Sequence, residues 1–190
     1  MNLRNKQIKE LCSIRMGHTF RQKPKYCDTG NTLVIQPGDV TPEGTLIFDS
    51  LCRAVVAVDQ NVKKGDVLLI NRGRFTATVF SGSPDFRCVV SSAFIILTPK
   101  ALEIIIPEYL ALLFNSIEMQ TTFKRLNETT TIPFISCSNL GAMIISIPAL
   151  DKQRALIGID EETKAYIRLT TRKIELRNRI LNGLITDSLN

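Results

Sequence analysis

The last forty residues of the chain constrain its fold most, because they form one helical pattern that no proline interrupts after Pro148. Pro148 ends the strand-like segment before it, and the carboxylate of Asp151 can accept a hydrogen bond from the first free N–H groups of a helix. We therefore expect a helix over residues 151–182. Such a helix is about 48 Å long at 1.5 Å per residue, which is longer than most helices of a single domain.

The apolar side chains of this segment recur at helical spacing and form a broad stripe. The stripe consists of Tyr166, Ile167, Leu169, Ile174, Leu176, Ile180, Leu181 and Leu184. A stripe of this width has to pack against another surface, which is either the chain's own domain or a second long helix in a coiled coil. Polar residues dilute the stripe and favour a short or imperfect pairing, namely Thr163, Thr170, Lys173 and Arg177.

Length and composition predict one ordinary domain followed by this helix. The chain has 190 residues, of which 44% are hydrophobic, and this is enough for a packed core. We place the domain at residues 1–147 and the helix at residues 148–190. No apolar run approaches the roughly 18 residues of a membrane span, and no export signal precedes the domain. We therefore expect a cytoplasmic protein with no membrane segment.

The cysteines and the single histidine indicate neither a metal centre nor a disulfide framework. The five cysteines are odd in number and widely spaced, so we expect small, reduced, partly buried residues. They are Cys12, Cys27, Cys52, Cys88 and Cys137. His18 is the only histidine, which excludes histidine-based metal clusters and leaves little choice of a base for nucleophilic catalysis. No glycine-rich phosphate loop and no nucleophile elbow occurs.

The positive charge of the chain is concentrated at its beginning. The formal net charge is +6, and residues 1–25 contain seven basic residues against one acidic residue. A basic segment without acidic neighbours suits a polyanion such as DNA, because each neutralised phosphate releases counterions. An ordinary solvated surface is the alternative interpretation, and charge alone does not decide between them.

The middle of the chain predicts an α+β fold, with a mixed, largely antiparallel sheet or partial barrel and one packed helix. Residues 8–14 fit a short helix or a strand. A helix is expected from Pro107 to about Arg125, because Pro107 suits a first helical turn and the apolar residues that follow share one face. The expected strands, separated by turn signals, are residues 33–35, 45–48, 52–58, 67–70, 75–80, 88–97 and 143–147.

Several motifs, in order, resemble the specificity subunits of type I restriction-modification systems. They lie at residues 14–21, 34–40, 64–73, 106–116 and 144–153, and the resemblance covers about residues 8–185. The family's helix entry usually has a second proline where this chain has Ala149 and a glutamate where it has Lys152, whereas Gln153 and Ile157 match. A full subunit of this kind carries two target recognition domains and two long helices, and this chain has one of each.

The resemblance implies a protein that recognises DNA and performs no catalysis. In such complexes the recognition domains bind separate halves of a split site, and partner modification subunits hold S-adenosylmethionine and methylate adenine. We therefore expect double-stranded DNA and methyltransferase subunits as partners, with a restriction subunit left open, and no cofactor on this chain. A half-length chain needs a second copy, so we expect a homodimer whose helices pack antiparallel on an inverted-repeat site.

The candidate DNA contacts are basic, hydroxyl and amide side chains in predicted loops. Arginine can fork to guanine edges, lysine mainly holds phosphate, and hydroxyl and amide groups contact both. An ordinary surface is the alternative for each of these residues. The candidates are Arg21, Lys23, Lys25, Arg72, Arg74, Ser81, Ser83 and Arg87, followed by Lys124, Arg125, Asn127, Thr129 and Thr130.

Other functions stay open at this point. The chain could be the recognition partner of a fused restriction-methyltransferase, a half-subunit exchanged with a full-length one, or a stand-alone DNA-binding regulator. A small nuclease is a further class, since Asp85 with Glu162 and Lys164 superficially resembles a metal nuclease pattern. We discount the nuclease because its second half lies on the long helix, and we expect no metal-dependent cleavage by the isolated chain.

Overall fold

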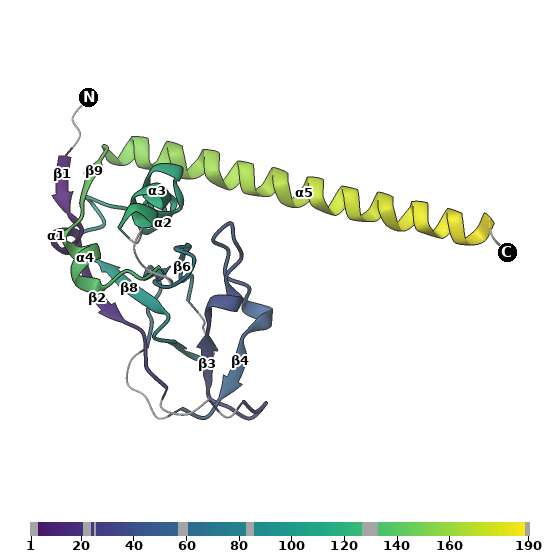
Figure 1. Cartoon of the computed structure of the whole chain (residues 1–190), viewed down its shortest axis with the longest axis horizontal. Coiled ribbons are helices and arrows are strands. Elements are labelled where there is room, and N and C mark those ends of the chain that lie inside the picture. The colour runs from purple at the N-terminus through teal and green to yellow at the C-terminus, as the bar shows by residue number, and fades with distance from the viewer. Residues whose placement is uncertain are drawn as a thin grey trace. The chain divides into compact units, whose positions relative to one another are not determined.

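A computed structural model gives the arrangement of the chain (Figure 1). The structure describes residues 4–20, 24, 26–56, 61–82, 86–126 and 133–188. Contacts divide the chain into two compact units, Met1–Arg154 and Ala155–Asn190, and each is described here by itself.

The largest sheet of the first unit has four antiparallel strands in the order β2-β8-β5-β6. Its central strands are short apolar runs buried on both faces, which is why they carry no alternation of polar and apolar residues. The strands are β2 (Cys12–Met16), β5 (Val67–Ile70), β6 (Ala77–Val79) and β8 (Phe94–Pro99).

Two smaller sheets complete the strands. In the three-stranded sheet, β3 pairs antiparallel with β4 and parallel with β7. In the two-stranded sheet, β1 and β9 lie side by side and antiparallel, although they come from opposite ends of the unit (Figure 1). The strands are β1 (Arg4–Gln7), β3 (Thr32–Ile35), β4 (Cys52–Ala54), β7 (Arg87–Val90) and β9 (Ile144–Ile147).

The predicted α+β class with mostly antiparallel strands is confirmed, and the described strands form separate sheets, not a closed barrel. One core cluster joins the two larger sheets, because apolar side chains from both contribute to it. Its members are Leu33, Ile35, Val40, Val62, Leu68, Ile70, Phe80, Cys88, Val90, Phe94 and Ile96.

The prediction of one long strand over residues 88–97 was wrong. The chain turns at residues 91–93, where the N–H of Phe94 donates to the carbonyl of Ser91 at 3.0 Å, so β7 and β8 belong to different sheets. Val90 and Phe94, on either side of this turn, are both buried. A turn inside a continuously buried apolar run leaves no signal in the hydrophobic pattern.

The predicted helix over residues 107–125 is in fact two helices, α2 (Pro107–Asn115) and α3 (Ile117–Arg125). Ser116 separates them with an extended backbone, φ −65° and ψ 150°. Its hydroxyl donates to the carbonyl of Leu113 at 2.7 Å and accepts the N–H of Met119 at 3.3 Å. Serine is a preferred N-cap, so this residue starts a new helix where the apolar pattern alone continues.

Smaller differences concern short elements. Residues 8–14, left open between helix and strand, contain both α1 (Ile8–Leu11) and the start of β2. In place of the expected strand at residues 45–48 there is one bridge between Val40 and Leu46, followed by the 3-10 helix η2 (Phe48–Ser50). Two further elements were not predicted, the 3-10 helix η1 (Pro37–Asp39) and the helix α4 (Cys137–Ala142).

Asp66 forms the buried polar centre of the first unit, and only 1% of its surface is exposed. Its carboxylate accepts the hydroxyl of Thr98 at 2.5 Å and the N–H of Lys63 at 2.9 Å, and lies 3.6 Å from Nη2 of Arg15. Buried carboxylates need such partners, because an uncompensated charge in the interior is costly. Asp66 therefore ties strands β2, β5 and β8 to the turn that precedes β5.

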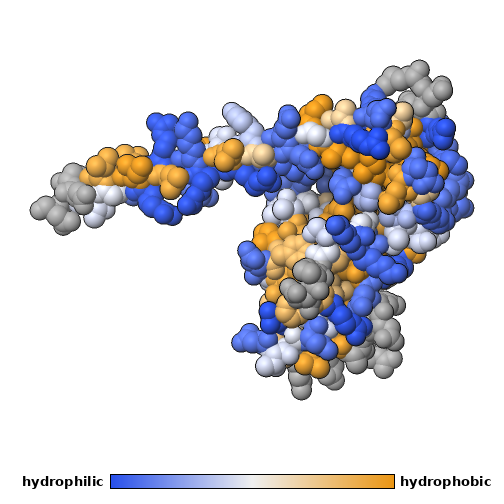
Figure 2. Space-filling view, turned by 180° about the vertical axis from the view of Figure 1, so that it is seen from behind, coloured by the Kyte–Doolittle hydropathy of each residue, from blue (hydrophilic) through white to orange (hydrophobic). Residues whose placement is uncertain are grey.

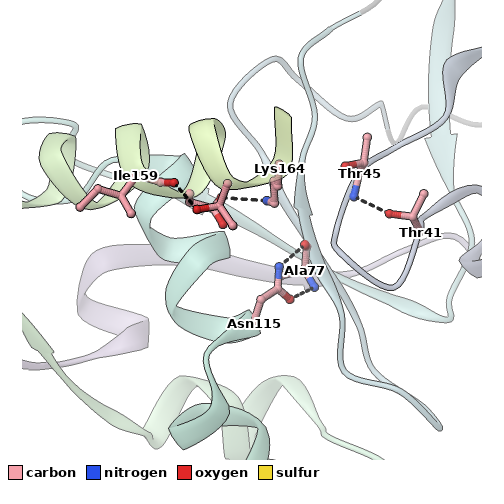
Figure 3. Close-up of polar contacts among 8 residues, drawn as sticks. Thr41, Thr45, Ala77, Asn115, Ile159 and Lys164 are labelled. Atoms are coloured by element: carbon pink, nitrogen blue, oxygen red, sulfur yellow. Dashed lines mark hydrogen bonds and ion pairs between the residues drawn. The ribbon is translucent and has the colours of Figure 1, made fainter. Parts of the chain in front are cut away.

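The end of α2 is attached to strand β6 by one side chain. The amide of Asn115 donates through Nδ2 to the carbonyl of Ala77 at 2.8 Å, and its oxygen accepts the N–H of Ala77 at 2.8 Å (Figure 3). The turn between Thr41 and Thr45 also packs here, because a Cβ at Gly44, which has φ +81°, would lie 2.5 Å from the Ala77 carbonyl oxygen. Only glycine fits this position.

The long C-terminal helix α5 spans Leu150–Ser188, which confirms the predicted element and extends it at its C-terminal end. Its 39 residues correspond to about 58 Å at 1.5 Å per residue. Ion pairs along the helix include one between Nζ of Lys164 and the carboxylate of Asp160, which lie 2.8 Å apart. Lys164 is labelled in Figure 3. None of the helices in the described part of the chain is long and apolar enough to cross a membrane.

The first turn of α5 belongs to the first unit and is anchored there by Gln153, which is fully buried. The side-chain oxygen accepts the N–H of Ile106 at 2.9 Å. The side-chain nitrogen donates to the carbonyls of Ile104 at 2.8 Å and Pro148 at 2.9 Å. One buried amide thus pairs three backbone groups that are themselves partly or fully buried.

Replacing Gln153 by leucine should lower the free energy of unfolding by about 3 kcal/mol, because three backbone groups lose their partner in a buried place. Urea unfolding followed by circular dichroism measures this loss. Lys152→Gln is the matched control, since Lys152 is exposed on the same turn and should change stability by less than about 0.5 kcal/mol. Equal stability of Gln153→Leu and the wild type would contradict the anchoring role.

Candidate functional site

The loop between β5 and β6 carries two of the predicted DNA contacts, Arg72 and Arg74. This loop is fixed by backbone hydrogen bonds to residues distant in sequence. The N–H of Asn71 donates to Ala93 at 2.9 Å, and its carbonyl accepts the N–H of Ile135 at 3.0 Å. The N–H of Gly73 donates to the carbonyl of Pro133 at 3.0 Å. The loop therefore has a defined conformation before any ligand binds.

Arg72 is exposed, and its guanidinium lies over the ring of Phe134, 5.5 Å from the ring centroid. The two residues also face each other across an antiparallel backbone bridge. No carboxylate or carbonyl of the described residues accepts a hydrogen bond from this guanidinium. This cation–π contact places the positive guanidinium against the aromatic ring.

Arg74, two residues further on, has a different environment. Its Nη2 donates to the carbonyl of Pro37 at 2.6 Å and to the carbonyl of Val40. Gly73 between the two arginines has φ +76°, a conformation that glycine adopts without strain and that turns the chain here. Arg74 therefore joins the β5–β6 loop to the chain around η1.

Two further arginines have partners inside the unit. Arg87, the first residue of β7, donates through Nε to the side-chain oxygen of Asn61 at 3.2 Å. Arg53 on β4 was not among the sequence candidates. Its guanidinium lies 4.2 Å from the ring centroid of Phe86, and its Nη1 donates to the carbonyl of Asp28 at 3.3 Å. In the sequence, Arg53 is a basic residue within the apolar run of residues 52–58. This pattern could have indicated that its side chain is exposed.

The remaining candidates are exposed or lie outside the described residues. Ser81 is exposed in the loop after β6, and Lys124 and Arg125 are exposed in the last turn of α3, where basic residues suit the helix dipole. His18 packs edge-on against Phe20 with ring centroids 4.8 Å apart. The candidates outside the described residues are Arg21, Lys23, Lys25, Ser83, Asn127, Thr129 and Thr130.

A cavity of about 700 Å³ lies beside β4 and η2. Burial raises the pKa of the Tyr26 hydroxyl above its ordinary value, and electrostatic interactions with Cys52 and Asp39 raise it further. The residues that line the cavity are Tyr26, Cys27, Asp28, Asp49, Ser50, Leu51, Cys52 and Arg53. They provide hydrogen-bond donors and acceptors but no arrangement that activates a nucleophile.

The described residues contain no cluster of three metal-ligating side chains. The five cysteines are free in the structure. Burial raises the pKa of Cys12 to about 12, so this thiol stays protonated and is a poor nucleophile.

The second unit presents the predicted apolar stripe of α5 as an exposed surface. Exposed fractions run from 41% at Leu176 to 72% at Leu169, and Ile159 and Ile185 extend the stripe beyond the predicted set. Figure 2 shows apolar side chains along the C-terminal part of this helix, between hydrophilic ones. The eight predicted residues, Tyr166, Ile167, Leu169, Ile174, Leu176, Ile180, Leu181 and Leu184, are all exposed.

Comparison with known proteins decides the family. A profile of the type I restriction modification DNA specificity domain matches residues 2–178, which include both the first unit and most of α5. The chain belongs to this family. The resemblance noted in the sequence motifs is therefore confirmed.

Relatives of this specificity-domain chain are larger proteins. The type I restriction enzyme HindI specificity subunit of Haemophilus influenzae is 29% identical over 129 residues, which is 65% of this chain and 27% of that subunit. A chain from a study of complex assembly and conformational transition in a type I restriction-modification system has a TM-score of 0.63 at 20% identity. That match covers 90% of this chain and 40% of the other.

The HsdS subunit of Thermoanaerobacter tengcongensis gives a TM-score of 0.60 at 18% identity, covering 90% of this chain and 39% of that subunit. At these identities the likeness to solved structures concerns the fold. The specificity-domain chain spans roughly a quarter to two fifths of the length of these relatives.

The two loop arginines should differ in their effect on stability. Arg74→Ala removes two hydrogen bonds from a charged donor and should lower the free energy of unfolding by about 1 kcal/mol. Arg72→Ala removes only a surface stack and should stay within about 0.5 kcal/mol of the wild type. Thermal and urea unfolding of the two variants measure the difference. A larger loss for Arg72→Ala than for Arg74→Ala would contradict these assignments.

Proposed function

We propose that this specificity-domain chain recognises a DNA sequence for a type I restriction-modification complex and directs methyltransferase subunits to it. The observation that carries the proposal is the family match over residues 2–178, because it covers the folded unit and the long helix together. The exposed Arg72 on a fixed loop adds a group suited to nucleic acid.

In this proposal the chain performs no catalysis and binds no cofactor. S-adenosylmethionine is held by the partner methyltransferase, which transfers the methyl group to adenine. The nuclease alternative has little support from the described residues, because Lys164 pairs with Asp160 on α5 while Glu162 is exposed on the same helix. Asp85, the third residue of that pattern, lies outside the described residues.

The exposed face of α5 supports a homodimer as the working form. Large apolar side chains on a soluble helix favour a partner surface, because burying them removes apolar area from water. A second copy of α5 packed antiparallel about a two-fold axis offers each stripe an identical partner. The length of α5 would then set the separation of two identical recognition units, and hence of two DNA half-sites.

Co-expression with a candidate type I methyltransferase subunit tests the proposed function. We expect the two proteins to purify together and the host DNA to carry methylated adenine in a split, inverted-repeat sequence. Mapping of methylated bases across the host DNA measures this. A chain that binds DNA but never purifies with the methyltransferase would instead be a regulator, and metal-dependent cleavage by the chain alone would indicate a nuclease.

Light scattering tests the homodimer. At tens of micromolar, the chain of 21.3 kDa should scatter as a particle of twice that mass. Ile174→Glu introduces a charge into the apolar stripe and should shift the mass toward the monomer, because the charge would lose its hydration in the interface. Arg168→Glu, at an exposed polar position of the same helix, is the matched control and should remain dimeric. A monomeric wild type at this concentration would contradict the homodimer.

A further inference from the structure

We propose that Arg72, oriented by Phe134, is a specificity-determining residue that binds the edge of a guanine in the target DNA. This inference rests on the proposed function and deepens it, since it names the chemical group that one side chain recognises. Three observations support it: the loop is fixed, the guanidinium is stacked, and its donors have no acceptor among the described residues.

The fixed loop comes first, because reading a base requires a side chain that starts from a defined place. Asn71 is buried, and its side-chain amide donates to the carbonyl of Ser92 at 3.3 Å. Together with the backbone bonds of Asn71 and Gly73 to neighbouring segments, this holds the residues on both sides of Arg72. The guanidinium of Arg74 fixes the loop on a third side.

The cation–π contact with Phe134 then limits where the guanidinium can lie. An arginine that lies over an aromatic ring uses its face for this contact, and its N–H fork stays available in the plane. The ring of Phe134 is itself 40% exposed, so the pair forms a mixed apolar and cationic surface.

Comparison with the other arginines of the unit distinguishes Arg72. Arg53 has the same kind of aromatic partner, but its guanidinium also donates to the carbonyl of Asp28. Arg74 and Arg87 likewise donate to protein oxygens. Arg72 lies over an aromatic ring, and no oxygen of the described residues accepts a hydrogen bond from its guanidinium.

The ligand suited to a flat, oriented fork is a planar group with two adjacent acceptors. Guanine presents O6 and N7 in this way in the major groove. Phosphate also accepts two hydrogen bonds, but a mobile lysine binds it equally well, and a neighbouring apolar ring does not strengthen that contact. The exposed ring of Phe134 instead suits base edges, where a thymine methyl group can contact it.

Selection from a library of randomised DNA duplexes, with the full chain alone and with its methyltransferase, tests the inference. The wild type should enrich a motif with a guanine at one fixed position. Arg72→Lys keeps the charge but loses the fork, so its motif should lose the preference at that position and keep the others. Its affinity for the wild-type duplex should fall roughly tenfold or more, with less than a twofold change on a random 30-base-pair duplex.

Three variants complete the design. Phe134→Leu should weaken the same guanine preference, because the fork loses its orientation. Arg72→Ala should leave the salt dependence of binding unchanged, whereas loss of a phosphate contact would lower the slope by about one. Arg53→Ala is the matched control, because Arg53 also lies over an aromatic ring but donates to a protein carbonyl. This variant should change the base preference at no single position of the motif.

An identical motif for Arg72→Lys and the wild type would overturn the inference, as would an equal loss of affinity on selected and random duplexes. A lower salt slope for Arg72→Ala would do the same and would assign the residue to phosphate. If Arg53→Ala lost the base preference at one position of the motif, the lack of a protein acceptor would no longer distinguish Arg72 from Arg53. If the wild type enriches no motif in either form, the proposed function fails and the inference fails with it.

Discussion

The side-chain amide of Gln153 determines where the long helix begins, because it binds backbone groups on both sides of that point. It joins the first turn of α5 to the segment before α2 and to the carbonyl of Pro148. A carboxylate could accept the N–H of Ile106 but could not donate to two carbonyls, so glutamine alone among residues of its size satisfies all three. The first turn of α5 is therefore folded together with the rest of the first unit.

The departures from the family's usual helix entry become understandable from the same contacts. Ala149 and Lys152, which replace the usual proline and glutamate, are both exposed. Gln153, which matches, is buried and fully bonded. The two residues that depart from the family's usual entry are thus ones that the interior does not constrain.

Sequence reasoning succeeded where a local pattern determines the element. The helix α5 and strands β3, β5 and β9 were predicted close to their observed bounds, because their apolar periodicity and flanking turns are local signals. It failed at residues 91–93 and at Ser116, where a tertiary contact or a cap divides a continuous apolar run. The roles of Arg72 and Arg74 were equally hidden, since the carbonyls of Pro37 and Val40 that engage Arg74 are distant in the sequence.

The paired hydrogen bonds between Asn115 and Ala77 have a consequence for solubility. Strand β6 lies at the outer edge of the four-stranded sheet, where unpaired N–H and C=O groups can accept a strand from another molecule. The amide of Asn115 occupies both groups of Ala77 as a neighbouring strand would. One side chain therefore closes this edge of only three residues to intermolecular pairing.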